Sequence, residues 1–345
     1  MRRSEITISL TALRRNVRRL KQAAGAAELW AVVKADAYGH GASDVSRVAL
    51  EEGATALCVA TVQEGAALRS IFERARIIVL GPLAHGEDRV ARAAGLEVTA
   101  TVAALPPDLP VHVKVDTGMG RFGMSPAEVA QLSSTSVVGL MSHLATADCE
   151  DATFAREQIE RFAAFAAVAN GRFPGATRHL ANTAAALRFP ESRFDAVRCG
   201  IGLYGLSPFG DEPARHGLEP VLAWRSYVAQ AKTLGIGEST GYGRRFVAAR
   251  QTRIGLVPVG YADGFRRAMS GGTVLVEGSR RQVLGTVSMD SFAVELGDER
   301  EGAVVTILGD GLLAEEHARH LGTINYEVTS AIRGSAERAE RRVVD

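Results

Sequence analysis

Short, continuous apolar runs alternate with amphipathic helical stretches through the first two-thirds of the chain, and this alternation restricts the fold more than any other feature. Each run lacks the polar–apolar alternation of a strand that has one face in water. Continuous apolar runs are typical of parallel strands that are buried on both faces. The runs lie at 31–35, 56–60, 76–80, 96–100, 111–115, 137–141, 178–182 and 196–201.

The stretches between these runs have helical periodicity. We expect helices at 11–23, 43–52, 62–74, 86–94, 126–132 and 154–169, the last with one marked face formed by Phe154, Gln158, Phe162 and Phe165. Eight strands that alternate with helices predict an α/β fold, a closed (β/α)8 barrel of the TIM type. An open, doubly wound sheet is the alternative, because periodicity does not distinguish the two arrangements.

The pattern changes after about Leu218. Short runs rich in Val, Ile and Thr are now separated by glycines or polar turns, with little helix between them, at 221–231, 253–259, 273–277, 281–287, 292–296 and 304–308. This pattern predicts a mostly antiparallel β-domain. Pro, Gly and charged residues gather at 206–217, so we place the barrel at 10–217 and the β-domain at 218–345. The charged stretch 333–345 is expected to fray.

Composition excludes several classes of partner. The formal net charge is +1, so no strong field favours nucleic acid or an anionic membrane. The three cysteines are too few and too scattered for a disulfide framework or a zinc site, and we expect no metal. The N-terminus lacks the pattern of a signal peptide, and no apolar run is long enough to cross a bilayer. These features favour a cytoplasmic protein.

The first chemically informative segment ends an apolar run with a lysine, in the sequence Ala31-Val-Val-Lys34-Ala-Asp-Ala-Tyr38-Gly-His-Gly41. Burial of an ammonium group is costly and lowers its pKa, and the neutral amine can then attack a carbonyl to form a Schiff base. At the carboxyl end of the first barrel strand, Lys34 would open onto the catalytic face. A lysine extending to solvent from a strand end is the simpler alternative.

A second segment, Lys114-Val-Asp116-Thr-Gly-Met-Gly-Arg121-Phe-Gly123, follows the fifth run with a glycine-rich loop. The planar guanidinium of Arg121 suits a carboxylate or a phenolate oxygen. A structural cluster in which Lys114 and Arg121 pair with Asp116 would explain the same residues.

Other polar residues follow later strands of the predicted barrel. His143 comes just after the sixth run, and Asn182 and Thr183 come after the seventh, where Asn-Thr is also a common helix cap. Residues 200–205 match G-x-G-x-x-G, but they follow the last strand and Pro208 obstructs a helix, so a dinucleotide site is disfavoured. Bare backbone amides at these glycines could still approach a phosphate closely.

The predicted β-domain adds four short motifs, Gly241-Tyr242-Gly243, Gly260-Tyr261-Ala-Asp263-Gly264, Ser288-Met289-Asp290 and Ile324-Asn-Tyr326-Glu327. Taken singly, tyrosines beside glycines often only pack at turns. The ordered set, together with AVVKADAYGHG, KVDTGMGRFG and RCGIGLYG, closely resembles the bacterial alanine racemases, from the N-terminal strand to about Glu327.

The resemblance implies a pyridoxal 5′-phosphate-dependent isomerase that interconverts L-alanine and D-alanine and so supplies D-alanine. It also implies that residues 1–9 join the β-domain, and that the chain forms a homodimer whose active sites each borrow residues from the partner's β-domain. Lys34 would be the Schiff-base lysine and one catalytic base, and Tyr242 of the partner subunit the other.

The resemblance also assigns supporting residues. The cofactor phosphate would be surrounded by Tyr38, Asn182, Thr183, Gly200, Ile201 and Tyr326. Arg198 would face the pyridine nitrogen, and His143 would link it to Tyr242. The substrate would contact Arg121, the backbone N–H of Met289 of the partner subunit, and Tyr261. Lys114 resembles a lysine that relatives often carry as a carbamate.

Elementary chemistry supports two bases. Racemisation removes a proton from one face of the α-carbon and returns one to the other, and a single lysine in a rigid site cannot reach both. Tyrosine can serve if cationic neighbours lower its pKa from about 10. An arginine at the pyridine nitrogen keeps its own proton and should disfavour transamination.

Two departures from the family pattern concern Ser288, where cysteine is common, and 333–338, which lacks the usual Arg-Val-Pro-Arg. The second puts the substrate entryway in doubt, although Arg267 could serve it. Three alternative functions remain. They are a broad-specificity or serine-type racemase, a barrel-type amino-acid decarboxylase, which Arg198 disfavours, and a non-catalytic cofactor-binding barrel, which the second domain disfavours.

Overall fold

The computed structural model describes residues 3–106, 108–132, 136–309 and 311–345. The chain forms two compact units. The first unit contains Leu13–Leu203 with His216–Leu218, and the second contains Met1–Ala12, Tyr204–Arg215 and Glu219–Asp345. Each unit has its own buried core and is described by itself.

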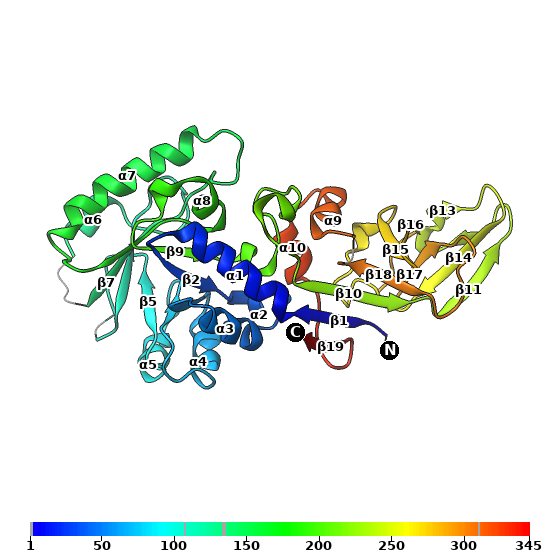
Figure 1. Cartoon of the computed structure of the whole chain (residues 1–345), viewed down its shortest axis with the longest axis horizontal. Helices are drawn as coiled ribbons and strands as arrows, with labels where there is room; N and C mark the ends of the chain where they lie inside the picture. Colours follow the sequence, from blue (N-terminus) through cyan, green and yellow to red (C-terminus); the bar gives the residue numbers. More distant parts are fainter. Residues whose placement is uncertain (1–2, 107, 133–135, 310) are drawn as a thin grey trace. The chain divides into compact units, whose positions relative to one another are not determined.

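The first unit is a closed barrel of parallel strands in sequence order, with helices around it in Figure 1. Its strands are β2 (Glu28–Val32), β3 (Ala56–Val59), β4 (Ile77–Val79), β5 (Glu97–Ala100), β6 (Val111–Lys114), β7 (Val137–Met141), β8 (Thr177–His179) and β9 (Ala196–Cys199). Closure occurs between β2 and β9, where Glu28 pairs with Ala196. The predicted barrel is therefore confirmed, and the open, doubly wound sheet is excluded.

Helices and short 3-10 turns precede the first barrel strand, connect most of the later strands and follow the last one. They are α1 (Leu10–Ala24), α3 (Ala42–Glu51), α4 (Val62–Arg69), α5 (Glu87–Ala93), α6 (Pro126–Val129), α7 (Thr153–Asn170) and α8 (Thr183–Arg188), with short 3-10 turns η1 (Pro190–Ser192) and η2 (Ile201–Tyr204). Local sequence explains several of their starts. Thr61 and Glu64 form a reciprocal capping box before α4, which satisfies backbone amides that the helix itself cannot. Gln158, Phe162 and Phe165 are buried on one face of α7, as their spacing predicts.

The second unit is built on a nine-stranded sheet in the order β11-β14-β17-β16-β15-β18-β10-β1-β19. Its strands are β1 (Glu5–Ser9), β10 (Leu222–Tyr227), β11 (Gln230–Leu234), β14 (Thr252–Val257), β15 (Thr273–Val276), β16 (Ser279–Leu284), β17 (Phe292–Glu295), β18 (Val304–Leu308) and β19 (Glu340–Val344), and a small ribbon adds β12 (Ser239–Thr240) and β13 (Phe246–Val247). All pairings except β1 with β19 are antiparallel. The predicted antiparallel β-domain is confirmed.

The ends of the second unit differ from the sequence expectation. Residues 340–344, which we expected to fray, form β19 and pair in parallel with β1, with Glu5 opposite Glu340. The pairing is possible because β1 offers a second edge on the side away from β10, and edge amides gain partners there. Two further helices were not predicted, α9 (Ala314–Leu321) and α10 (Asn325–Ser330). The remaining 3-10 turns are η3 (Pro213–His216), η4 (Tyr242–Arg244) and η5 (Arg267–Met269).

Candidate active site

Lys34 lies just beyond the carboxyl end of β2, the end of barrel strands at which active sites form. The residues before it, Ala31 to Val33, are fully buried, and Lys34 itself is half-buried. Burial lowers the pKa of the Lys34 amine, and the nearby positive charge of Arg121 lowers it further, whereas Glu64 opposes the shift. The environment therefore makes the neutral, nucleophilic amine more accessible than it is in a solvent-exposed lysine.

The segment after Lys34 is a left-handed turn. In α2 (Lys34–Gly39), left-handed backbone angles occur at four consecutive non-glycine residues, with φ between 49° and 55°, at Ala35, Asp36, Ala37 and Tyr38. Such residues cost about 1–2 kcal/mol each, and backbone strain of this kind gathers at functional sites. Glu64 fixes the start of this turn, because its Oε1 accepts a hydrogen bond from the backbone N–H of Ala35 at 2.7 Å. The turn places Tyr38 in a buried position near Lys34.

Arg121 is carried by a loop that Asp116 organises. The carboxylate of Asp116 accepts the backbone N–H groups of Gly118 (2.8 Å), Met119 (2.8 Å) and Gly120 (3.0 Å). Although partial burial opposes ionisation, these amides lower the pKa of Asp116. The carboxylate is thus engaged by the loop itself. The conformation of the loop does not depend on a pairing of Asp116 with Arg121, and Arg121 is exposed.

Lys114 ends β6 and is buried, with 5% of its surface exposed. Its Nζ lies 5.9 Å from the ring centroid of Phe122. Burial lowers the pKa of Lys114 to about 8, and the positive charges of Arg121 and Arg198 add to the shift. A substantial fraction of this amine is therefore neutral near physiological pH.

Arg198 lies in β9 and is held by acceptors on both terminal nitrogens. Its Nη1 donates to His179 Nδ1 at 2.9 Å and to the His179 carbonyl at 2.8 Å. Its Nη2 donates to the carbonyls of Ser142 (2.8 Å) and Leu180 (3.1 Å) and to His143 Nδ1 (3.3 Å). Burial lowers the pKa of Arg198 to about 10, so the group is still charged at neutral pH. The hydrogen bonds fix the plane of the guanidinium.

His143 follows β7, and its tautomer follows from its contact with Arg198. A guanidinium N–H can only donate, so His143 Nδ1 accepts, and the ring proton is on Nε2. Burial and then the charge of Arg198 lower the pKa of His143 to about 3. His143 is consequently a neutral side chain with a donor at Nε2.

Three of the predicted phosphate-binding residues, Tyr38, Thr183 and Gly200, converge beyond the carboxyl ends of β2, β8 and β9. The N–H of Gly200 donates to Thr183 Oγ1 at 3.1 Å. A Cβ at Gly200 would lie 2.6 Å from the Tyr38 hydroxyl oxygen, so glycine is required for this approach. Ile201 begins η2, and Asn182 caps α8 by accepting the Ala185 N–H at 3.0 Å. Asn182 has the helix-cap role that its sequence context also allowed.

The β-domain gathers three further predicted residues on adjoining loops. Tyr242, Tyr261 and Met289 are 73%, 42% and 53% exposed. The Thr286 hydroxyl donates to the Tyr242 carbonyl at 2.8 Å, and the Tyr261 N–H donates to the Ser288 carbonyl at 3.1 Å. The segment 285–290 therefore supports all three. Tyr326 lies in α10 and is half-buried.

Arg338 stabilises these loops and was not identified in the sequence. It forms ion pairs with Asp263 (3.2 Å) and Asp290 (2.8 Å), which follow Tyr261 and Met289. Asp263 in turn accepts the Gly260 N–H at 2.8 Å. The stretch that departs from the family pattern thus carries an arginine that ties both loops together.

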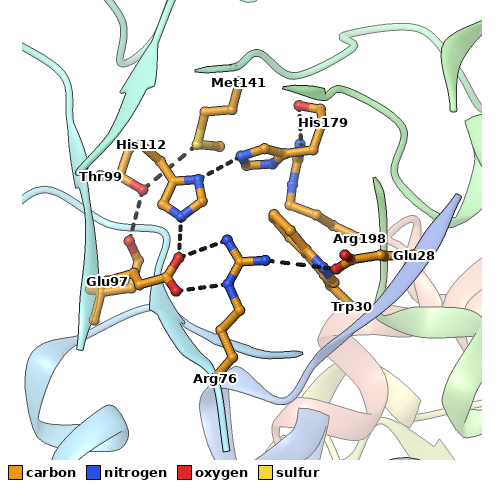
Figure 2. A network of polar contacts seen from close by, with 10 residues as sticks. Glu28, Trp30, Arg76, Glu97, Thr99, His112, Met141, His179 and Arg198 are labelled. Atoms are coloured by element: carbon orange, nitrogen blue, oxygen red, sulfur yellow. Dashed lines mark hydrogen bonds and ion pairs between the residues drawn. The ribbon is translucent and has the colours of Figure 1, made fainter. Parts of the chain in front are cut away.

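Sequence reasoning also missed three polar residues inside the barrel, His179, His112 and Glu97. Figure 2 shows them joined in a row that reaches Arg198. Each belongs to a barrel strand, Glu97 at its start, His112 within it and His179 at its end, so a polar residue in a predicted strand was the available signal.

Two negative observations concern the part of the chain that the structure describes. None of its helices is long and apolar enough to cross a membrane. No group of three or more His, Cys, Asp or Glu side chains within it is arranged to hold a metal ion.

Fold and site together define a class of barrel proteins with a second, β-rich unit and a half-buried lysine at the carboxyl end of the first barrel strand. Residues 8–208 match the family model for the N-terminal domain of alanine racemase, and residues 221–341 match the model for its C-terminal domain. The chain belongs to the alanine racemase family.

Individual relatives are similar along nearly their whole length. The alanine racemase of Symbiobacterium thermophilum is 39% identical, with 96% of this chain and 95% of that protein covered. The solved alanine racemase of Streptomyces coelicolor A3(2) is 37% identical with a TM-score of 0.91, covering 99% of this chain and 98% of that one. The Bartonella henselae enzyme, solved with covalently bound pyridoxal phosphate, is 26% identical with a TM-score of 0.90 and 99% coverage of both chains.

Proposed function

We propose that this protein interconverts L-alanine and D-alanine with pyridoxal 5′-phosphate attached to Lys34, and that it works as a homodimer with shared active sites. The observation that carries the proposal is the position of Lys34, a half-buried amine of lowered pKa near Arg121 and Arg198 at the carboxyl ends of the barrel strands. Membership of the alanine racemase family supports the substrate and the cofactor.

The residues present fit pyridoxal phosphate. An anionic group suits the backbone near Gly200, where the Tyr38 hydroxyl and Thr183 Oγ1 lie within contact distance of that glycine. Tyr38 is kept neutral, because burial raises its pKa, and so it can donate a hydrogen bond. The Ile201 amide and Asn182 would complete the phosphate site, although the Asn182 oxygen is already used in the cap of α8.

Arg198 would face the ring nitrogen. Its hydrogen bonds with described residues all leave from Nη1 and Nη2, so its Nε–H remains to donate. When bound, the cofactor supplies a sink for the electron pair left by the departing α-proton. Since a guanidinium of pKa about 10 keeps its proton at neutral pH, Arg198 donates a hydrogen bond without transferring a proton.

Two bases act on opposite faces of the α-carbon. Lys34 exchanges a proton at Nζ on one face, and the partner subunit's Tyr242 exchanges a proton at its hydroxyl oxygen on the other. The exposure of Tyr242 supports this sharing, because 73% of the residue's surface is open within a single chain. Gly241 and Gly243 bracket it with φ of 78° and 73°, which fixes the turn that presents it.

His143 would assist the tyrosine. Because Nδ1 accepts from Arg198, the Nε2–H is the group that can donate to the hydroxyl oxygen of the partner subunit's Tyr242. A donor there would stabilise the negative charge on the phenol oxygen when the tyrosine has given up its proton.

Arg121 would bind the substrate carboxylate through its guanidinium fork. Met289 of the partner subunit would add its N–H, which no described residue of this chain accepts, and the partner subunit's Tyr261 would line the same side. Lys114 would carry a carbamate, since CO2 reacts with the neutral amine and a pKa of about 8 leaves about a tenth of it neutral at pH 7, far more than in an ordinary lysine. The resulting anion would hold Arg121 in place.

The decisive experiment measures racemisation of L-alanine and D-alanine by the purified protein, with a visible spectrum recorded on the same sample. We expect activity in both directions and an absorbance band from the bound cofactor. Serine and basic amino acids serve as comparison substrates. If the protein shows no preference for alanine over serine, the assignment of alanine as the substrate is wrong. If it releases CO2 from a basic amino acid, the reaction is a decarboxylation and not a racemisation.

A further inference from the structure

Glu97, His112, His179 and Arg198 form a row of polar side chains through the interior of the barrel. They come from four strands, β5, β6, β8 and β9, and all of them except the partly buried Glu97 are buried (Figure 2). His112 and His179 are completely buried. Because an unpaired polar group is costly in such surroundings, each ring nitrogen must have a defined partner.

The direction of the hydrogen bonds in this row follows from Arg198. Its Nη1 can only donate, so His179 Nδ1 accepts at 2.9 Å and the His179 proton is on Nε2. His179 Nε2 then donates to His112 Nδ1 at 2.8 Å. The proton of His112 is therefore on its own Nε2, which donates to Glu97 Oε2 at 2.7 Å.

This direction requires both histidines to be neutral. A second proton on either ring would place two N–H groups against each other, at His179 Nδ1 or between the rings. Burial lowers the pKa of both, and the charge of Arg198 lowers that of His179 further. Glu97 is charged at the far end. Burial opposes its ionisation, but the hydrogen bonds from His112 and Arg76 lower its pKa to about 2.

The surroundings are built to fit the row. Trp30 packs against both imidazoles, with ring centroids 4.5 Å from His179 and 5.8 Å from His112. In β7, Gly139 leaves the necessary space, because a Cβ there would collide with His112 Nδ1. Arg76 donates to both oxygens of Glu97, at 2.7 and 2.9 Å, and so fixes the carboxylate.

Arg198 needs such support because its direct neighbours supply no full negative charge. Its acceptors are three backbone carbonyls and two neutral imidazoles. A hydrogen-bond chain in a medium of low dielectric polarises along its length, so the charge on Glu97 strengthens the acceptor that His179 offers to Arg198.

We infer that His179, His112 and Glu97 are positioning residues, which form a one-way hydrogen-bond chain from the amino ends of the barrel strands to Arg198 and hold its guanidinium in the orientation that meets the cofactor. The contact with the cofactor rests on the proposed function, whereas the hydrogen-bond chain itself does not. Glu97 thus acts on Arg198 through two intervening side chains, those of His112 and His179.

The first test reads the tautomers directly in the unmodified protein. The ring nitrogens of the full chain, labelled with 15N-histidine, are observed by NMR at neutral pH, with His112→Asn and His179→Asn used only to assign signals. We expect both rings to be neutral with the proton on Nε2. A proton on Nδ1 of either ring, or a doubly protonated ring, overturns the chain, even if the protein proves to have no racemase activity.

The second test compares Glu97→Gln with Glu28→Gln in the cofactor-loaded protein. The introduced glutamine would keep an oxygen acceptor for His112 but remove the charge. Glu28 is the matched control, because it lies 3.7 Å from Arg76 and accepts the Trp30 indole N–H at 2.7 Å, and its glutamine keeps an oxygen acceptor for that N–H. For Glu97→Gln we expect kcat to fall about tenfold, with KM within about twofold and a shifted absorption maximum of the cofactor. The Glu28→Gln protein should match the unmodified one.

Equal spectra and equal kcat in the two variants would overturn the positioning role, even if Glu97→Gln lowers the melting temperature, because a purely structural role predicts that result. Absence of cofactor from the unmodified protein would instead refute the proposed function and leave the tautomer measurement to decide the hydrogen-bond chain.

Discussion

Replacement of Gly200 by alanine tests the phosphate site through a single added methyl group. Gly200 does not have a positive φ, so alanine introduces no backbone strain there. The added Cβ would lie 2.6 Å from the Tyr38 hydroxyl oxygen, 3.1 Å from Tyr38 Cζ and 3.4 Å from Val32 Cβ. The tyrosine must move, but it has little room, because it is 9% exposed and belongs to the left-handed turn after Lys34.

Two costs follow from that displacement. Overpacking in a well-packed interior destabilises a protein by about 1–3 kcal/mol. A hydrogen bond to a charged group contributes about 1.5–3 kcal/mol, so loss of the contact between Tyr38 and the phosphate should cost about 2 kcal/mol of cofactor binding. That free energy corresponds to a rise of about 30-fold in the Kd for pyridoxal phosphate.

The assay is a titration of cofactor-free protein with pyridoxal phosphate, followed by absorbance, with a thermal melt of each variant. The matched control is Gly171→Ala at the end of α7, where the nearest atom to an added Cβ is 3.7 Å away. Because Tyr38→Phe removes the clashing oxygen, the double variant should bind about as well as Tyr38→Phe alone. An unchanged Kd in Gly200→Ala, or strict additivity in the double variant, would refute the reasoning.

The remaining predictions concern the reacting groups. Lys34→Ala should abolish the visible absorbance of the bound cofactor, and an unchanged spectrum would exclude Lys34 as the point of attachment. Tyr242→Phe should keep the cofactor but lose at least about 100-fold in racemisation rate, the usual contribution of a general acid–base group, whereas full activity would contradict the two-base assignment. Mixing the inactive Lys34→Ala and Tyr242→Phe proteins should restore part of the activity through hybrid dimers; no recovery under conditions that exchange subunits would refute the shared site. Burial lowers the pKa of Lys114 to about 8, so its reactive neutral form grows as pH rises from about 7 to about 9. The carbamate signal in 13C NMR with labelled bicarbonate should therefore increase over that range, and a signal that falls or stays level would count against carbamylation.

The barrel could be predicted because one local property, a continuous run of apolar residues, identifies its strands. Parallel strands buried on both faces need only apolar residues, as in the Cys58 strand β3, where every residue is buried. β19 could not be predicted in the same way. Glu340 to Val344 carry three charged residues, and their strand conformation depends on the edge of β1, which is far away in sequence. Local patterns do not record such long-range pairing.

The candidate site was predictable where a motif has a local cause. The glycines on either side of Tyr242 mark a sharp turn, and Gly200 marks a close approach of the backbone to a side chain. Both signals are visible in a single sequence. The left-handed turn after Lys34 was not predictable, because Ala35 to Ala37 include no glycine, the residue that adopts positive φ routinely. That conformation is imposed by tertiary contacts such as the one from Glu64.

The buried histidines show a different limit. His112 and His179 occur inside predicted strands, and a single histidine in an apolar run is ordinarily a satisfied core residue. Their importance becomes apparent only when the barrel closes and brings β6 and β8 into contact with β9 through one line of hydrogen bonds.

The pairing of β1 with β19 has a consequence for how the chain acquires its structure. β1 precedes the barrel segment and its partner strands β10 and β19 follow it, so the barrel interrupts the β-domain in sequence. Contacts between such distant segments form slowly, because a large loop must be closed first. The barrel, whose strands are nearly contiguous, can therefore fold while the β1 backbone still lacks both neighbouring strands. A protein shortened before Glu340 would keep one of those edges exposed for its whole lifetime, and we expect it to aggregate through that edge.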